Sequence, residues 1–168
     1  MPENQLRLLN RICDVNPNVV FVSVSGAPYD MAFEGRVRGI LQMYLGGEAA
    51  DEACAALVTG RVNPSGKLAE SWPYAVEDTP CHGFFATGSD DIEYRESIYV
   101  GYRYYDRFGV PVRFPFGFGL SYTTFSYANL ELSCGEYTGG TLVASLDVTN
   151  TGPVAGAEIV ELYVENPP

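Results

Sequence analysis

The chain has 168 residues, of which 46% are hydrophobic and 18% are charged. At about 150 residues per domain, this length predicts one domain, or one and a part, with a real core, and it excludes disorder for most of the chain. Ten basic residues against 21 acidic ones give a net charge of −11, which disfavours binding to nucleic acid or to an anionic membrane surface. The charge does not exclude binding to neutral, hydroxyl-rich partners such as sugars.

Further patterns concern membrane insertion, secretion and the distribution of charge along the chain. No run of about 18 apolar residues occurs, so a membrane span is not expected. The polar, acidic start of the chain is not typical of a signal peptide. The charge is uneven, because no Lys or Arg follows Phe114, whereas six acids do: Glu131, Glu136, Asp147, Glu158, Glu161 and Glu165.

Two helices and two strands are predicted in the first 60 residues. Apolar residues on one face indicate a helix over 3–13, and the β-branched run at 19–24 is typical of a strand covered on both faces. A second strand is expected at 39–45. An alanine-rich helix is expected at 48–58, ended by Gly60 in the left-handed conformation. This alternation predicts an α/β sheet flanked by helices, of which only part is present.

The middle of the chain shows little periodicity. A short strand is expected at 67–72, followed by a long irregular region over 73–91. Aromatic and β-branched residues at 94–106 favour an extended segment. The alternating Phe and Gly of 113–122 predict a loop whose rings pack between two bodies.

The last part of the chain changes to the alternation of a β-sandwich. Strands are expected at 124–133, 141–149 and 157–164, with the turn Asn150–Gly152 before the third. An immunoglobulin-like sandwich needs about seven strands, so an incomplete one is predicted.

The four cysteines are scattered, and no two of them have the two-residue spacing of a zinc or redox motif. Two disulfides are possible, but we favour reduced, mostly buried thiols, and with them a cytoplasmic location. Nothing else in the sequence indicates the cellular compartment of the protein. The cysteines are Cys13, Cys54, Cys81 and Cys134.

Cys81 is followed by His82, the only histidine. One Cys and one His cannot complete a zinc site without carboxylates, so an ordinary loop pair is favoured over a metal site. A catalytic triad is not expected either, because no nucleophile motif surrounds the single histidine.

Three stretches carry a family resemblance. Gly60–Pro73 reads GRVNPSGKLAESWP, Tyr94–Asp106 reads YRESIYVGYRYYD, and Phe114–Phe125 reads FPFGFGLSYTTF. In this order they resemble the C-terminal part of bacterial β-glucosidases of glycoside hydrolase family 3. The flanks at 16–22 and 148–160 fit the same pattern. The resemblance covers nearly the whole chain.

The resemblance implies a three-part layout. In the family, a barrel-like domain holds the nucleophilic Asp, an α/β sandwich domain supplies the acid/base Glu in most subfamilies, and a fibronectin-type-III-like domain often follows. Residues 1–76 resemble the last part of the α/β sandwich. Residues 77–122 resemble the linker that wraps back along the protein, and residues 123–168 resemble the first strands of the fibronectin-like domain.

The same resemblance implies that both catalytic carboxylates lie outside the chain. No Asp or Glu here matches either motif, and a retaining glycosidase needs two carboxyl groups about 5–5.5 Å apart. We therefore assign no catalytic residue and no metal ligand, identify no substrate-binding residue, and expect no cofactor. Two small departures from the family pattern are Ser97, where Gly is usual, and Ala50–Asp51, where two glycines are common.

Other candidate sites have more ordinary interpretations. Glu93 and Glu96 could form a carboxylate pair, but residues three apart in a strand point to opposite faces, and a pairing of Glu96 with Arg95 or Arg103 is favoured. Gly46–Glu48 could bind an anion at a helix start, but a tight turn capped by Glu48 is favoured.

Five tyrosines could form a sugar platform, but an aromatic seam between domains is favoured. They are Tyr94, Tyr99, Tyr102, Tyr104 and Tyr105.

The sequence thus predicts an α/β part followed by an all-β part: a partial, mostly parallel sandwich sheet, a wrapping linker and an incomplete fibronectin-like sandwich. The expected function is a scaffolding part of a retaining β-glycosidase acting on β-glucosides, inactive when isolated. The alternative is a non-catalytic carbohydrate-binding or protein-interaction module. Uncovered sheet edges predict that the isolated chain self-associates.

Overall fold

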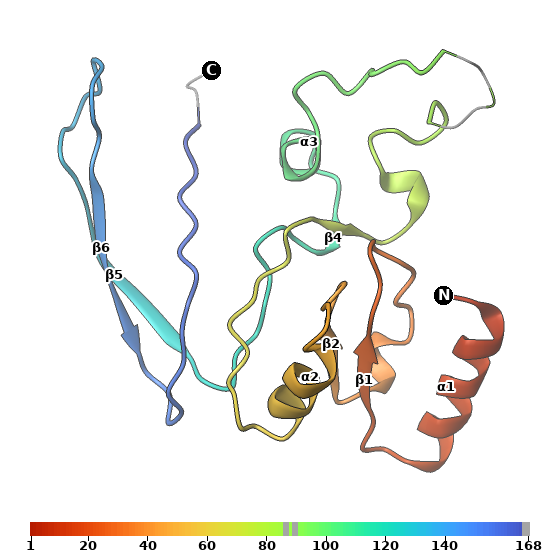
Figure 1. Ribbon diagram of the computed structural model, residues 1–168. Coiled ribbons are helices and arrows are strands. Elements are labelled where there is room, and N and C mark those ends of the chain that lie inside the picture. Colours follow the sequence, from red (N-terminus) through yellow and green to blue (C-terminus); the bar gives the residue numbers. More distant parts are fainter. Residues whose placement is uncertain (86–87, 89–90, 166–168) are drawn as a thin grey trace. The chain divides into compact units, whose positions relative to one another are not determined.

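The computed structural model describes residues 1–85, 88 and 91–165 (Figure 1). The chain forms two compact units. The first unit contains Met1–Ala55 and Leu68–Phe118, and the second contains Ala56–Lys67 and the chain from Gly119 onward. The three-part division at residues 76 and 122 stays a prediction. Among the described residues, no helix is both long and apolar enough to cross a bilayer.

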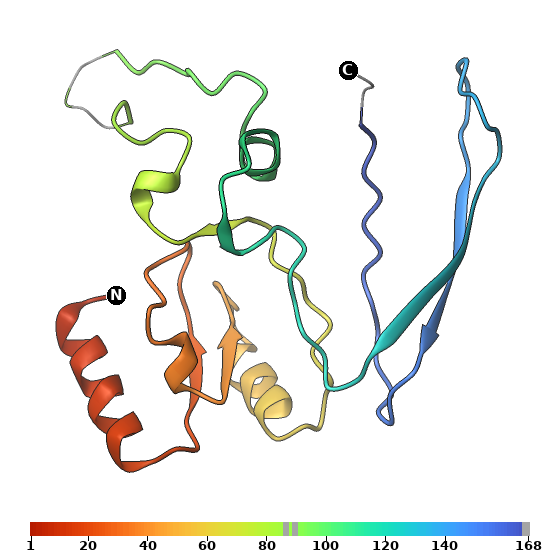
Figure 2. The same cartoon turned by 180° about the vertical axis from the view of Figure 1, so that it is seen from behind.

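The first unit begins with a helix and a parallel strand pair, as predicted. Helix α1 spans Glu3–Val15, strand β1 spans Val20–Ser23 and strand β2 spans Gly39–Gln42. The strands pair in parallel, with Val20 opposite Gly39 and Ser23 opposite Gln42. Figure 2 shows the pair from behind, with α1 beside β1.

A small apolar core fixes these elements. It consists of the buried residues Leu9, Met31, Phe33 and Trp72. Phe33 is packed edge-on against Phe21 of β1, with the ring centroids 4.8 Å apart. The core therefore holds α1, β1 and the loop that joins β1 to β2 around a single tryptophan.

Helix α2 spans Ala50–Val58 and begins two residues later than predicted. Gly47 has φ of 66°, a left-handed conformation that favours glycine in the turn before the helix. A side chain at Gly46 would clash with the helix, because its Cβ would lie 2.7 Å from the Ala50 Cβ. Gly60 is left-handed, with φ of 72°, as predicted. Close packing at Gly46 thus places the start of α2.

The predicted strand at 67–72 is mostly irregular. Strand β3 covers only Trp72–Pro73, and it pairs antiparallel with β4 at Val112–Phe114. The prediction of a loop over 113–122 was therefore wrong at its start. Phe114 stacks on Phe118, with the centroids 5.0 Å apart, so rings of this stretch pack on one another within the first unit.

The extended segment predicted at 94–106 was also wrong. Helix α3 spans Tyr102–Phe108 and ends at Gly109, which is left-handed with φ of 63°. Tyr105 faces inward and is 6% exposed. Burial of the Tyr105 ring, together with Gly109 at the C-terminal end of α3, favours a helix here over the strand that the tyrosines prefer locally.

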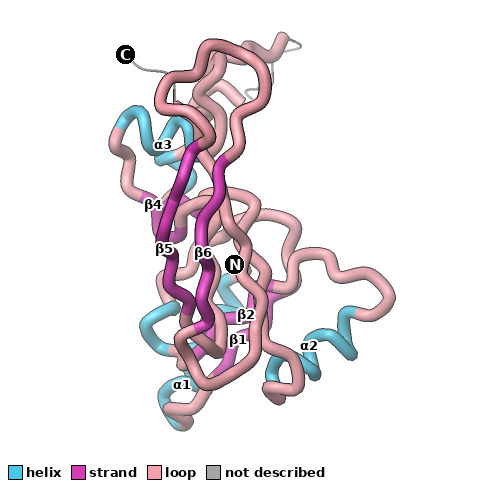
Figure 3. The backbone as a smooth tube through the Cα atoms, turned by 90° about the vertical axis from the view of Figure 1, so that its left-hand side faces the viewer, coloured by secondary structure: helices cyan, strands magenta, loops and turns pink. Residues whose placement is uncertain are grey.

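The second unit contains an antiparallel hairpin. Strand β5 spans Phe125–Leu132 and β6 spans Ala144–Asn150, with an irregularity in the register between Ala128 and Glu131 (Figure 3). The third strand expected at 157–164 is not formed, although the trace is extended there (Figure 1). The described residues form three two-stranded sheets, so the larger parallel sheet and the sandwich of the prediction are not confirmed.

Ser97 offers a test of backbone strain in the first unit. It has φ of 56°, a region that favours glycine. We expect Ser97→Gly to raise the free energy of unfolding by about 0.5–1 kcal/mol, because it relieves this strain, and to raise Tm by about 1–4 °C. Thermal unfolding measures the change. Ser97→Ala keeps the Cβ and is the control; an equal gain for both variants would contradict the explanation.

Candidate functional site

The carboxyl ends of β1 and β2 carry a set of polar side chains. Gln42 Nε2 donates to the Ser25 carbonyl oxygen at 3.3 Å and to Ser25 Oγ at 3.0 Å. The loop that follows β1 is therefore hydrogen-bonded to the last residue of β2.

Tyr44, in the loop after β2, is held in an unusual conformation. Its φ is 50°, which costs a bulky residue of order 1–3 kcal/mol. Its hydroxyl accepts a hydrogen bond from Trp72 Nε1 at 3.4 Å. Burial raises the pKa of Tyr44; the Trp72 hydrogen bond opposes the rise and the Glu70 charge adds to it. These contacts offset the strain.

Tyr29, in the loop after β1, packs against the same tryptophan. Its ring meets Trp72 edge-on, with centroids 5.3 Å apart. Burial raises the pKa of Tyr29, and the Ser23 hydroxyl opposes that rise. Sequence reasoning missed Tyr29, Tyr44 and Glu70, because no spacing in the chain connects them. The one signal was a carboxylate, Glu70, two residues before the only tryptophan.

The candidate pair Glu93 and Glu96 is arranged differently from either interpretation. Arg95 Nε donates to Glu93 Oε2 at 2.5 Å, so Arg95 engages Glu93 rather than Glu96. This hydrogen bond, and next the positive charge of Arg95, lower the pKa of Glu93. In the part of the chain that the structure describes, no contact joins the carboxylates of Glu93 and Glu96.

The five tyrosines do not share one surface. Tyr105 is buried and Tyr94 is 88% exposed. Tyr99 and Tyr104 both contact Phe108, with centroids 5.3 and 5.2 Å apart. These ring contacts lie within the first unit, and the role of the rings as a seam between domains stays a prediction.

Cys81 and His82 belong to no group of metal ligands among the described residues. Cys81 Sγ lies 3.9 Å from Thr79 Oγ1, and His82 is exposed. All four cysteines are half-buried, rather than mostly buried as expected, and their reduced state stays a prediction. Over residues 1–85, 88 and 91–165, no group of three His, Cys, Asp or Glu side chains could hold a metal ion.

Gly46–Glu48 forms a turn, as favoured. The acids in the first turn of α2 are Asp51 and Glu52, because the helix begins at Ala50. Glu48 precedes that turn, so its proposed role as a cap stays a prediction.

In the second unit, an ion pair joins segments that are far apart in the sequence. Lys67 Nζ lies 2.8 Å from Glu158 Oε1, and it donates to the Gly119 carbonyl oxygen at 2.7 Å. The side chains are only 15% and 9% exposed. The Lys67 hydrogen bond lowers the pKa of Glu158, and burial opposes this effect.

Asn63 connects the same segments. Its Oδ1 accepts hydrogen bonds from Ser121 Oγ at 2.9 Å and from the Tyr122 amide at 2.8 Å. Its Nδ2 donates to the Ala155 carbonyl oxygen at 3.1 Å. The segment 63–67, which belongs to the first family-like stretch, thereby organises the second unit.

Comparison with known proteins decides the family. A family profile described as "Glycosyl hydrolase family 3 C-terminal domain" matches residues 1–122. The chain belongs to glycosyl hydrolase family 3. The resemblance seen in its three sequence stretches is thus confirmed.

Curated relatives of this family 3 chain are named as β-glucosidases. It is 42% identical over 167 residues to "Thermostable beta-glucosidase B" of Acetivibrio thermocellus, covering 99% of this chain and 22% of that protein. It is 40% identical over 173 residues to "Probable beta-glucosidase I" of Aspergillus flavus, covering 99% of this chain and 21% of that protein. The chain therefore spans about a fifth of the length of these relatives.

Solved structures of β-glucosidases are also similar to this chain. The β-glucosidase 3B of Thermotoga neapolitana, in complex with α-D-glucose, matches with a TM-score of 0.82 and 35% identity, covering 90% of this chain and 22% of that chain. A family 3 β-glucosidase of Bifidobacterium adolescentis matches with a TM-score of 0.83 and 36% identity, at the same coverages. The arrangement of the described elements is therefore one that family 3 enzymes use.

The Lys67–Glu158 pair gives this family 3 chain a defined dependence on pH. Because the pKa of Glu158 is lower in the folded state, its contribution is present above the pKa of an unfolded Glu and is lost as pH falls through the folded value. We expect Glu158→Gln to reduce the free energy of unfolding by about 1–3 kcal/mol near neutral pH, and the difference from the unaltered chain to vanish in acid.

Urea unfolding at neutral and acidic pH measures this difference. Glu136→Gln, at an exposed position in the same unit, is the matched control. A Glu158→Gln effect that stays constant in acid would show that the ion pair is not its cause.

Proposed function

We propose that the chain is a C-terminal part of a longer family 3 enzyme that hydrolyses β-glucosides with retention, and that its role there is structural. The observation that carries the proposal is the 42% identity to a β-glucosidase over 99% of the chain, which corresponds to only 22% of that relative. Such a match relates the chain to one portion of an enzyme rather than to a separate activity.

The chemistry of the described carboxylates supports a structural role. A retaining glycosidase needs one ionised and one protonated carboxyl group, and the acid usually has a raised pKa. The carboxyl groups whose pKa departs from its ordinary value, Glu93 and Glu158, are both shifted downward by a neighbouring cation. Asp14 and Glu34 are likewise paired with Arg36 and Arg113.

In the proposed whole enzyme, catalysis depends on residues outside this chain. By the family resemblance, an Asp attacks the anomeric carbon while a Glu protonates the leaving oxygen, and water then hydrolyses the glycosyl-enzyme. The contribution of this chain is part of the α/β sandwich, the linker and the start of the β domain. No metal or organic cofactor takes part in this scheme.

The proposal predicts that the purified chain does not hydrolyse p-nitrophenyl β-D-glucoside above the buffer rate, because it lacks the pair of carboxyl groups. The matched control is the product of the full reading frame, found by sequencing the DNA on both sides. That product is expected to be active and to carry a barrel with the Asp. Turnover by the chain alone that follows the protein through purification would refute the structural role.

A second proposal is that the chain acts as a protein-interaction module, and one apolar surface favours it. An apolar groove lies between α1 and β1, lined by Leu8, Leu9, Ile12 and the strand residues Val20 and Val22. In the described part of the chain, β1 pairs only with β2, so its other edge has no strand partner. Free edges and apolar grooves promote association.

We therefore expect the isolated chain to self-associate, and Val20→Glu to weaken that association by placing a charge in the groove. Val20 is 53% exposed, so the variant is expected to fold. Sedimentation velocity at micromolar concentration measures the effect. Val76→Glu, at another exposed valine of the first unit, is the control. A monomeric unaltered chain would contradict the proposal.

A further inference from the structure

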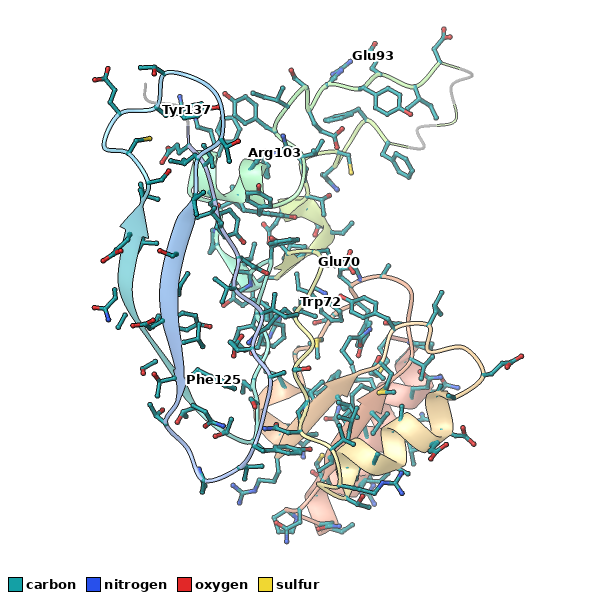
Figure 4. All side chains as sticks on the ribbon, turned by 60° about the vertical axis from the view of Figure 1, so that its left-hand side comes forward. Glu70, Trp72, Glu93, Arg103, Phe125 and Tyr137 are labelled. Atoms are coloured by element: carbon teal, nitrogen blue, oxygen red, sulfur yellow. The ribbon has the colours of Figure 1, made fainter. Side chains whose placement is uncertain are left out.

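We draw no further inference here: the strongest candidate, a polar hollow on the β5–β6 hairpin (Figure 4) lined by Asn129, Glu131, Ser145 and Asp147, is an exposed acidic cluster, and nothing among the described residues indicates which ligand would bind there.

Discussion

Burial of Trp72 is the interaction on which the first unit depends. Its ring meets Tyr29 and Phe114 edge-on, with centroids 5.3 and 6.4 Å apart, and its indole nitrogen donates to Tyr44. The ring therefore connects β3, β4 and the loops that follow β1 and β2. Truncation of a buried tryptophan typically costs about 3–5 kcal/mol. In this small core, that cost is a large part of the stability that a domain possesses.

The second unit depends on polar contacts and close backbone packing instead. Asn63 and Lys67 reach segments that lie far along the chain. A Cβ on Gly119 would lie 2.5 Å from the Gly66 carbonyl oxygen, and one on Gly156 would lie 2.6 Å from Asn63 Nδ2. These glycines let distant segments approach residues 63–67. An isolated two-stranded hairpin is marginally stable in water, so this segment supplies support that β5 and β6 lack by themselves.

Membership of family 3 is compatible with the structural role that we propose for the chain. Four described carboxylates, those of Asp14, Glu34, Glu93 and Glu158, are paired with cations, which suits an architectural part better than a general acid. In the proposed enzyme, the free edge of β1 and the groove beside α1 are surfaces that a larger sheet can cover.

The sequence by itself determined the family, both long helices, the parallel strands and the hairpin, because their signals are local: apolar periodicity, β-branched runs and turn residues. It failed at α3, where the tyrosines favour a strand, since burial of Tyr105 and the left-handed Gly109 decide the outcome. Only the tertiary structure paired Tyr44 with Trp72, 28 residues away, and Lys67 with Glu158. Such contacts follow from the packing of distant segments, which residue spacing does not encode.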